Sequence, residues 1–144
     1  MKRHIFIIIA CIFVLSTIHS VSLAQTGNGE PIKYISSCEI DLNADSLPDI
    51  ALLIETIKGR ELIVLLRTDS GYRSYLLMKD IPQQMFLTSR FGVEIKETIA
   101  GLGKNKKPKT YKTPGAYLVL YYPEGPSEGY YWDGKEFKEV WLTD

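Results

Sequence analysis

Short apolar runs, separated by turn residues, constrain the fold of this chain more than any other feature of its sequence. The two most apolar runs, residues 50–56 and 62–66, have the length of a β-strand and are too short for a typical globular helix. No segment keeps a helical period over a useful length. Strands are predicted over residues 34–40, 50–56, 62–66, 72–78, 93–99, 116–122, 129–132 and 136–142. The sequence therefore predicts an all-β fold of two antiparallel meanders, each of three to four strands, whose blade-like sheets pack together.

The apolar pattern and the turn residues give finer expectations. Residues 50–56 and 62–66 are almost continuously apolar, which predicts central strands that are covered on both faces. A short helical turn is expected within residues 84–90, and a loop over residues 101–115, which are rich in Gly, Lys, Pro and Thr. The Asp-Gly pair at residues 133–134 predicts a two-residue hairpin turn.

The N-terminal residues have the pattern of a secretory signal peptide. Lys2 and Arg3 precede an apolar run over residues 5–18, and small residues precede a predicted cleavage after Ala24. The alternatives are a retained membrane anchor and a lipid on Cys11, but the run is shorter than the roughly 20 residues that span a bilayer. We therefore expect a signal peptide over residues 1–24, a flexible leader over 25–33, and a single β domain over 34–144. The mature chain is expected to be exported to the periplasm or the extracellular space and to have no membrane span.

The composition of the mature chain excludes several classes of function. Cleavage removes two of the 17 basic residues and none of the 17 acidic ones, which leaves a net charge of −2 and argues against nucleic-acid binding. Both histidines, His4 and His19, leave with the signal peptide, so the mature chain has no imidazole base or metal ligand. Cys38 is then the only cysteine. A buried, inert thiol is favoured over a disulfide between two chains.

Oxygen-bearing side chains recur at a regular spacing just before the first strongly apolar run. Asp41, Asn43, Asp45 and Asp49 occupy positions 1, 3, 5 and 9 of a nine-residue segment, and Leu47 adds its carbonyl at position 7. A tightly coiled loop with this spacing can point all five oxygens at one centre, as Ca²⁺ prefers. The sequence therefore predicts a structural Ca²⁺ site here. The alternative is an Asx-type turn in which the side chains accept hydrogen bonds from their own backbone.

Residues 41–54 resemble the calcium loop of FG-GAP and VCBS-type repeats, in which Asp-x-Asn-x-Asp-Gly-x-x-Asp precedes a hydrophobic strand. The resemblance extends over residues 41–78 at most. It implies a calcium-binding loop and a role of the kind that these repeats have in adhesion or ligand-binding ectodomains. Such repeats usually build a β-propeller, and this chain has one copy and is too short for one. Ser46 stands where the pattern favours glycine.

Two further groups of residues are candidates for partner binding. The lysines of the 101–115 segment can dock an acidic protein or an anionic envelope surface, or can simply keep a loop solvated. Tyrosines of the last hairpin can form a face for sugar or peptide, or can pack in the core. The candidates are Lys104, Lys106, Lys107, Lys109, Lys112, Tyr130 and Tyr131.

No catalytic group is predicted. A glycosidase that uses Glu55, Glu61 or Glu94 is the weakest of three functional hypotheses. The first is an exported, non-enzymatic β-domain with one structural Ca²⁺ loop, which acts as a binding or structural module of the cell envelope. The alternative is a periplasmic inhibitor or immunity-type protein that blocks a secreted hydrolase through the 101–115 loop.

Overall fold

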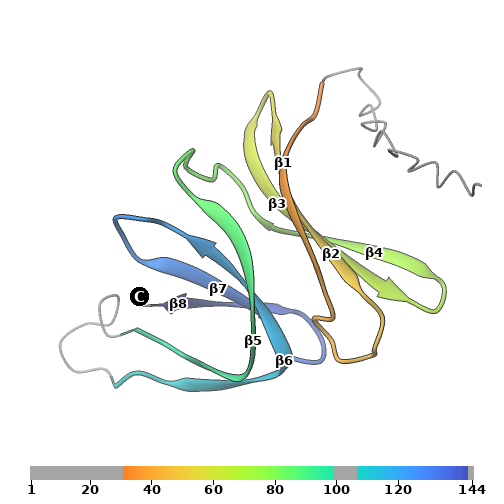
Figure 1. Ribbon diagram of the computed structural model, residues 1–144, viewed down its shortest axis with the longest axis vertical. Helices are drawn as coiled ribbons and strands as arrows, with labels where there is room; N and C mark the ends of the chain where they lie inside the picture. Colours follow the sequence, from red (N-terminus) through yellow and green to blue (C-terminus); the bar gives the residue numbers. More distant parts are fainter. Residues whose placement is uncertain (1–30, 99–106, 143–144) are drawn as a thin grey trace, which may run out of the picture.

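The computed structural model describes residues 31–98 and 107–142, and this part of the chain is all-β with no helix. Its eight strands run in chain order through the two halves of the molecule (Figure 1). They are β1 (Lys33–Ile40), β2 (Asp49–Thr56), β3 (Gly59–Thr68), β4 (Gly71–Met78), β5 (Phe86–Lys96), β6 (Thr110–Tyr121), β7 (Ser127–Trp132) and β8 (Phe137–Leu142). The predicted all-β fold is confirmed.

The strands form two antiparallel four-stranded sheets, each a meander of consecutive strands. Sheet A has the order β1-β2-β3-β4 and sheet B the order β5-β6-β7-β8. The sheets pack together, with the edge strands β1 and β5 in contact (Figure 1). This arrangement confirms the two packed meanders that the sequence predicts, and it gives β2 and β3 the central positions in sheet A.

The main core lies between the two sheets because alternate residues of each strand face inward. On β2 the buried residues are Asp49, Ala51 and Leu53, and on β3 they are Leu62, Val64 and Leu66. Sheet B contributes the inward residues of β6 and β7. Its buried members of the cluster are Ala116, Leu118, Leu120 and Tyr130.

Sheet B also encloses a smaller apolar cluster on its other side. The long β5–β6 ribbon has a bulge next to the pair Gly92 and Gly115, and Gly115 has a φ of 141°, which favours glycine. Beyond the bulge, the Thr98 N–H donates to the Trp141 carbonyl over 2.8 Å. The segment just after β5 thus meets β8, the other edge strand of sheet B. Sheet B therefore curves around a second cluster of buried residues. The cluster comprises Ile95, Val119, Tyr131, Val140 and Leu142.

Three finer predictions are wrong. Residues 84–90 form no helical turn, because the Met85 N–H closes a turn on the Pro82 carbonyl at 3.1 Å and β5 begins at Phe86. Residues 101–115 are not all loop, because β6 begins at Thr110. Pro114 is tolerated in that strand because it lies at the bulge, where no regular ladder bond is lost. The turn at 133–134 is longer than predicted, since four residues separate β7 from β8.

The outward side of β2 and β3 departs from expectation as well. Ile50, Leu52 and Ile54 are only half-buried and belong to neither apolar cluster. In the described part of the chain, only one face of these strands is covered. The prediction that both faces are covered is therefore wrong.

The predicted signal peptide and most of the predicted leader lie outside the described residues. Within residues 31–98 and 107–142, no helix is long and apolar enough to cross a membrane.

Candidate functional site

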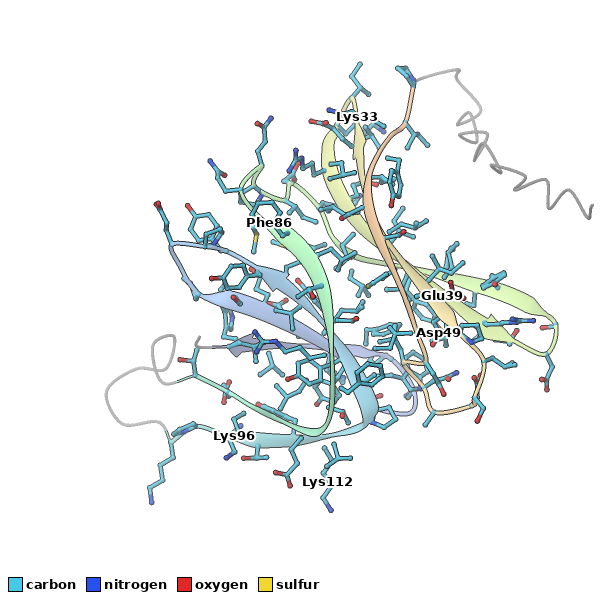
Figure 2. The ribbon with its side chains drawn as sticks, in the orientation of Figure 1. Lys33, Glu39, Asp49, Phe86, Lys96 and Lys112 are labelled. Carbon is cyan, nitrogen blue, oxygen red and sulfur yellow. The ribbon has the colours of Figure 1, made fainter. Side chains whose placement is uncertain are left out.

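The acidic segment forms the connection between β1 and β2, and Asp49 fastens it to the sheet. Asp49 is fully buried at the start of β2 (Figure 2). Its Oδ2 accepts the Leu42 N–H over 2.8 Å and its Oδ1 accepts the Arg67 N–H over 2.7 Å. Burial raises the pKa of the Asp49 carboxyl above its ordinary value, and the two backbone donors offset part of that rise. One carboxylate therefore joins the loop, β2 and β3.

The other oxygen-bearing side chains of the loop accept hydrogen bonds from the loop backbone. The two oxygens of Asp41 accept the N–H groups of Asp45 and Ser46, at 3.3 and 2.8 Å. Asp45 Oδ1 accepts the Leu47 N–H at 2.8 Å, and Asn43 Oδ1 accepts the Asp45 N–H at 3.1 Å. These are the bonds of an Asx-type turn, the alternative to a metal site that the sequence left open.

The loop backbone coils tightly enough to use left-handed conformations. Ala44 has a φ of 60° and Ser46 a φ of 68°. Residues with a Cβ atom adopt this region at a cost of about 1–2 kcal/mol. Ser46 stands where the calcium-loop pattern favours glycine, and its left-handed backbone is a conformation that glycine adopts more easily.

The predicted calcium ligands differ in their fit to a metal ion. Among the described residues, no group of three or more His, Cys, Asp or Glu side chains is placed to hold a metal ion. Asp49 is the poorest fit, because its carboxylate is fully buried and ties the loop to β3. Asp41, Asn43 and Asp45 lie at the surface of the loop, and each of their oxygens has a second lone pair. These three side chains, with the predicted Leu47 carbonyl, remain the candidate ligands for Ca²⁺.

A cleft of about 460 Å³ opens beside the acidic loop. Three separate segments line it: the acidic loop, the bent start of β6, and the β7–β8 turn. Its lining residues are Asn43, Lys112, Thr113, Pro114, Trp132, Asp133 and Gly134. The volume falls within the range of about 300–1,000 Å³ that is typical of ligand sites. We call this feature the three-segment cleft.

Trp132 is held at the cleft by two other rings. Its ring centroid lies 5.5 Å from that of Tyr75 on β4 and 5.1 Å from that of Phe137 on β8, both in edge-to-face geometry. Tyr75 and Phe137 also contact each other, at 5.3 Å. The three rings join sheet A to sheet B and restrict the motion of the indole.

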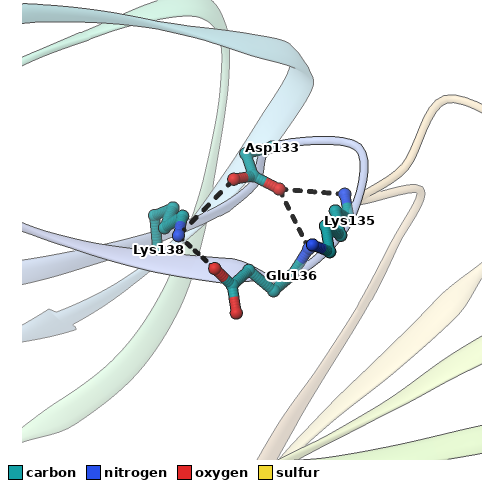
Figure 3. Close-up of polar contacts among 4 residues, drawn as sticks. All are labelled: Asp133, Lys135, Glu136 and Lys138. Carbon is teal, nitrogen blue, oxygen red and sulfur yellow. Dashed lines mark hydrogen bonds and ion pairs between the residues drawn. The ribbon is translucent and has the colours of Figure 1, made fainter.

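The β7–β8 turn is ordered by its own charges (Figure 3). Asp133 Oδ1 accepts the N–H groups of Lys135 and Glu136, both at 2.9 Å, while Lys138 pairs with the carboxylates of Asp133 and Glu136. The backbone donors of Glu136 and Lys135, aided by Lys138, hold the pKa of the Asp133 carboxyl below its ordinary value. The cleft therefore has a fixed, ionised carboxylate at its edge.

The predicted partner-binding residues separate into three groups. Lys104 and Lys106 lie outside the described residues. Lys107, Lys109 and Lys112 are exposed, and only Lys112 lines the cleft. Tyr130 and Tyr131 are 2% and 6% exposed and pack into the main and the second apolar cluster respectively. The structure thus places both tyrosines in the core rather than on a binding face.

Other candidate residues do not form a site. Glu55 and Glu61 point to opposite faces of sheet A, because Glu55 pairs with Arg60 and Glu61 with Ile54, and Glu94 lies on sheet B. Cys38 is a free, half-buried thiol that packs against the main core, and its burial raises its pKa. A raised pKa disfavours the reactive thiolate.

Sequence reasoning missed a buried polar group on β7. Glu128 is 6% exposed, and its Oε2 accepts the Tyr130 O–H at 2.7 Å. Burial raises the pKa of Tyr130, and the bond to Glu128 adds to the rise. Glu139 is exposed on β8 opposite Tyr130. Partial desolvation of its carboxyl raises its pKa, and repulsion from Glu128 adds to the rise. Glu128 and Tyr130 are two residues apart on β7 and therefore lie on one face of the strand. This spacing was the only sign of their contact in the sequence.

The raised pKa of Glu139 predicts a pH-dependent stability. The stability that its protonated form contributes is fully present below the unfolded pKa of about 4.5 and is lost as the pH rises through the folded pKa. We expect Glu139→Gln to raise the free energy of unfolding at pH 7 by about 0.5 kcal/mol, a value reduced for solvent screening, and to match the wild type near pH 4. Thermal melts between pH 4 and 7 measure this. Glu124→Gln, at an exposed turn, is the control, and an equal gain in both variants contradicts the assignment.

No family model, curated protein or solved structure matches this chain.

Proposed function

We propose that this chain is an exported, non-enzymatic binding module of the cell envelope, which takes a sugar ring of an envelope polysaccharide in the three-segment cleft. The cleft is the observation that carries the proposal, because it combines one aromatic ring with polar groups from three separate segments. Four of its lining side chains are polar or charged, and Trp132 and Pro114 supply the apolar part. A few placed polar groups are what fix the orientation of a ligand in a binding site.

The lining groups suit a sugar better than a purely apolar ligand. The indole of Trp132 offers a flat apolar surface that the other two rings hold in place. Around it, the Asn43 amide can donate and accept, and the Lys112 ammonium can donate. The Asp133 carboxylate can accept, as can the Thr113 hydroxyl, whose own proton is donated to the Gly92 carbonyl. Sugar hydroxyls need both donors and acceptors beside an apolar face.

The test compares the two tryptophans of the chain. Purified protein is incubated with insoluble peptidoglycan, chitin and cellulose, and the bound fraction is measured against protein concentration. We expect Trp132→Ala to weaken binding by at least about tenfold, since it removes a ring contact worth more than 1 kcal/mol. Trp141→Ala removes an exposed ring that is not part of the cleft, and is expected to leave binding unchanged.

Two further variants keep this test independent of folding. Trp132→Ala also removes a ring contact between the sheets, so Asn43→Ala and Lys112→Ala are measured beside it. Both change the cleft without removing that contact, and we expect several-fold weaker binding from each. Binding to none of the polysaccharides, or equal binding by all variants, overturns the proposal.

The inhibitor hypothesis is a second candidate because three exposed lysines lie at or just before the start of β6, and one of them, Lys112, lines the cleft. They are Lys107, Lys109 and Lys112. A secreted hydrolase with an acidic active site is the partner that this charge favours. Recovery of such an enzyme on the immobilised protein, and its loss when the three lysines are replaced by alanine, would favour this function over polysaccharide binding.

For the acidic loop, we propose that Ca²⁺ binds at Asp41, Asn43, Asp45 and the Leu47 carbonyl. The bound ion would neutralise clustered carboxylates and hold the loop against the cleft, to which Asn43 contributes. The left-handed backbone at Ala44 and Ser46 supports this proposal, because a tightly coiled loop is what the predicted ligand spacing requires.

We expect a higher melting temperature in Ca²⁺ than in EDTA. For a dissociation constant near 1 mM, typical of loose extracellular sites, about 10 mM Ca²⁺ adds roughly 1.4 kcal/mol, or about 5 °C or more for a domain of this size. Asp45→Ala is expected to abolish the shift, with Mg²⁺ as the ionic control. Identical melting in Ca²⁺ and in EDTA contradicts calcium binding and leaves the self-capped turn as the role of the loop.

A further inference from the structure

Sheet A has an outward face that is aliphatic across three of its strands. Alternate residues of β2, β3 and β4 point away from the core, and their register sets them side by side: Ile50 pairs with Leu65, and Leu52 with Ile63, which pairs in turn with Leu76. We call this the outer aliphatic face. It consists of Ile50, Leu52, Ile54, Ile63, Leu65 and Leu76.

The six side chains of the outer aliphatic face lie outside the core, although Ile54 also pairs with Tyr34 at the edge of the sheet. None of them belongs to the main or the second core cluster. Five are half-buried, and Leu76 is 47% exposed. Contiguous aliphatic surface of this kind is a feature of association sites.

We propose that the outer aliphatic face binds the same face of a second copy of this chain, as a two-fold symmetric dimer. The charges at the ends of β3 support this occupant over an unrelated one. Glu61 and Arg67 lie on the outward side of β3, each three residues from Val64. A two-fold axis that crosses the strands at Val64 sets Glu61 of one copy over Arg67 of the other.

The symmetry gives the dimer two such ion pairs, one at each end. The same axis places the row of Ile50 and Leu65 over the row of Leu52 and Ile63, so apolar side chains meet apolar side chains. Layers stacked in this way are the aligned sheet packing of β-sandwiches, about 10 Å apart. The face is thus complementary to itself in both charge and polarity.

The size of the face predicts a weak dimer. Three strands about 4.8 Å apart, over the roughly 20 Å from residue 61 to residue 67, give a projected area on the order of 300 Å². The accessible area of a corrugated face is larger, but it stays below the approximately 800 Å² per partner of a standard interface. The association is therefore expected to be reversible and dependent on concentration.

Sedimentation equilibrium of the purified protein tests the proposal through charge reversal. Glu61→Arg and Arg67→Glu each set like charges against each other at both ends of the homodimer, and each is expected to weaken dimerisation by about tenfold. A mixture of the two variants restores both ion pairs, so it is expected to form a heterodimer with wild-type strength. A fluorescent label on one variant distinguishes the heterodimer.

The controls separate the interface from folding. Lys33→Glu makes the same change of charge on sheet A at a residue that pairs with Glu55 on the opposite face, and is expected to leave dimerisation unchanged. Leu65→Lys is expected to abolish the dimer, with an unchanged circular dichroism spectrum as the check on folding. A wild-type monomer at roughly 1 mM, or a mixture of the charge variants that stays monomeric, overturns the proposal.

Discussion

Replacing Asp49 with alanine is expected to lower the free energy of unfolding by about 4 kcal/mol. The change removes two hydrogen bonds to a charged acceptor, each worth roughly 1.5–3 kcal/mol, and leaves the N–H groups of Leu42 and Arg67 without their acceptor. A loss of this size is a large part of the 5–15 kcal/mol that holds a typical domain folded. Urea denaturation followed by circular dichroism measures it.

Two variants show whether the effect belongs to the buried carboxylate. Asp45→Ala removes a loop carboxylate that bonds only to neighbouring residues at the surface, and is expected to cost about 1 kcal/mol. Asp49→Asn keeps the shape of the side chain, but its amide has one acceptor oxygen for the two N–H donors of Leu42 and Arg67. Its cost is therefore expected to fall between those of Asp45→Ala and Asp49→Ala, near 2–3 kcal/mol. Equal costs for Asp45→Ala and Asp49→Ala would contradict the role assigned to Asp49.

Replacing Leu53 with alanine is the second change with a large expected effect, about 3–4 kcal/mol. Leu53 is fully buried in the main core between the sheets, and its truncation loses apolar burial and leaves a cavity. β2 is paired along its length with β3 and, apart from a bulge between Tyr34 and Ser36, with β1, so the site has little freedom to collapse. Urea denaturation again gives the value.

The adjacent residue of the same strand is the matched control. Leu52 has the same chemistry, but it lies on the outer aliphatic face and is half-buried. Leu52→Ala is expected to cost no more than about 1.5 kcal/mol when measured on dilute protein. A comparable cost for the two variants would mean that the outer face is as fully packed as the core.

The sequence was sufficient to predict the strands that lie in the core. Residues 50–56, 62–66 and 72–78 each correspond to a strand of the structure with a shift of three residues or fewer at either end. Their apolar character and the turn residues between them agree, so local preference and packing favour the same structure. The prediction of two meanders rests on the same agreement between apolar runs and turn residues.

The first half of β5 and the start of β6 were not predicted, because local preference and tertiary context disagree there. Pro114 and Gly115 look like loop residues, yet the bulge opposite them removes the hydrogen bonds that they would disrupt. Phe86 to Phe91 contains no regular alternation, and its pairing with β6 fixes it as strand. Pairing partners distant in sequence are not visible in a window of local pattern.

For the candidate site, the sequence identified the residues better than their roles. It singled out the acidic loop, but it gave Asp49 the same role as Asp41 and Asp45, because spacing does not reveal that Arg67 donates to it from another strand. The cleft was not predictable, since its lining comes from three segments that only the packing of the two sheets brings together.

The order of the strands has a consequence for how the chain acquires its structure. Every ladder in the described residues joins strands that are consecutive in sequence, so no pairing has to wait for a distant segment. The entropy of loop closure is small for such pairings, and folding is faster than in β proteins with long crossovers. Each half can therefore form as a separate cooperative unit, with docking of β1 against β5 as the late step.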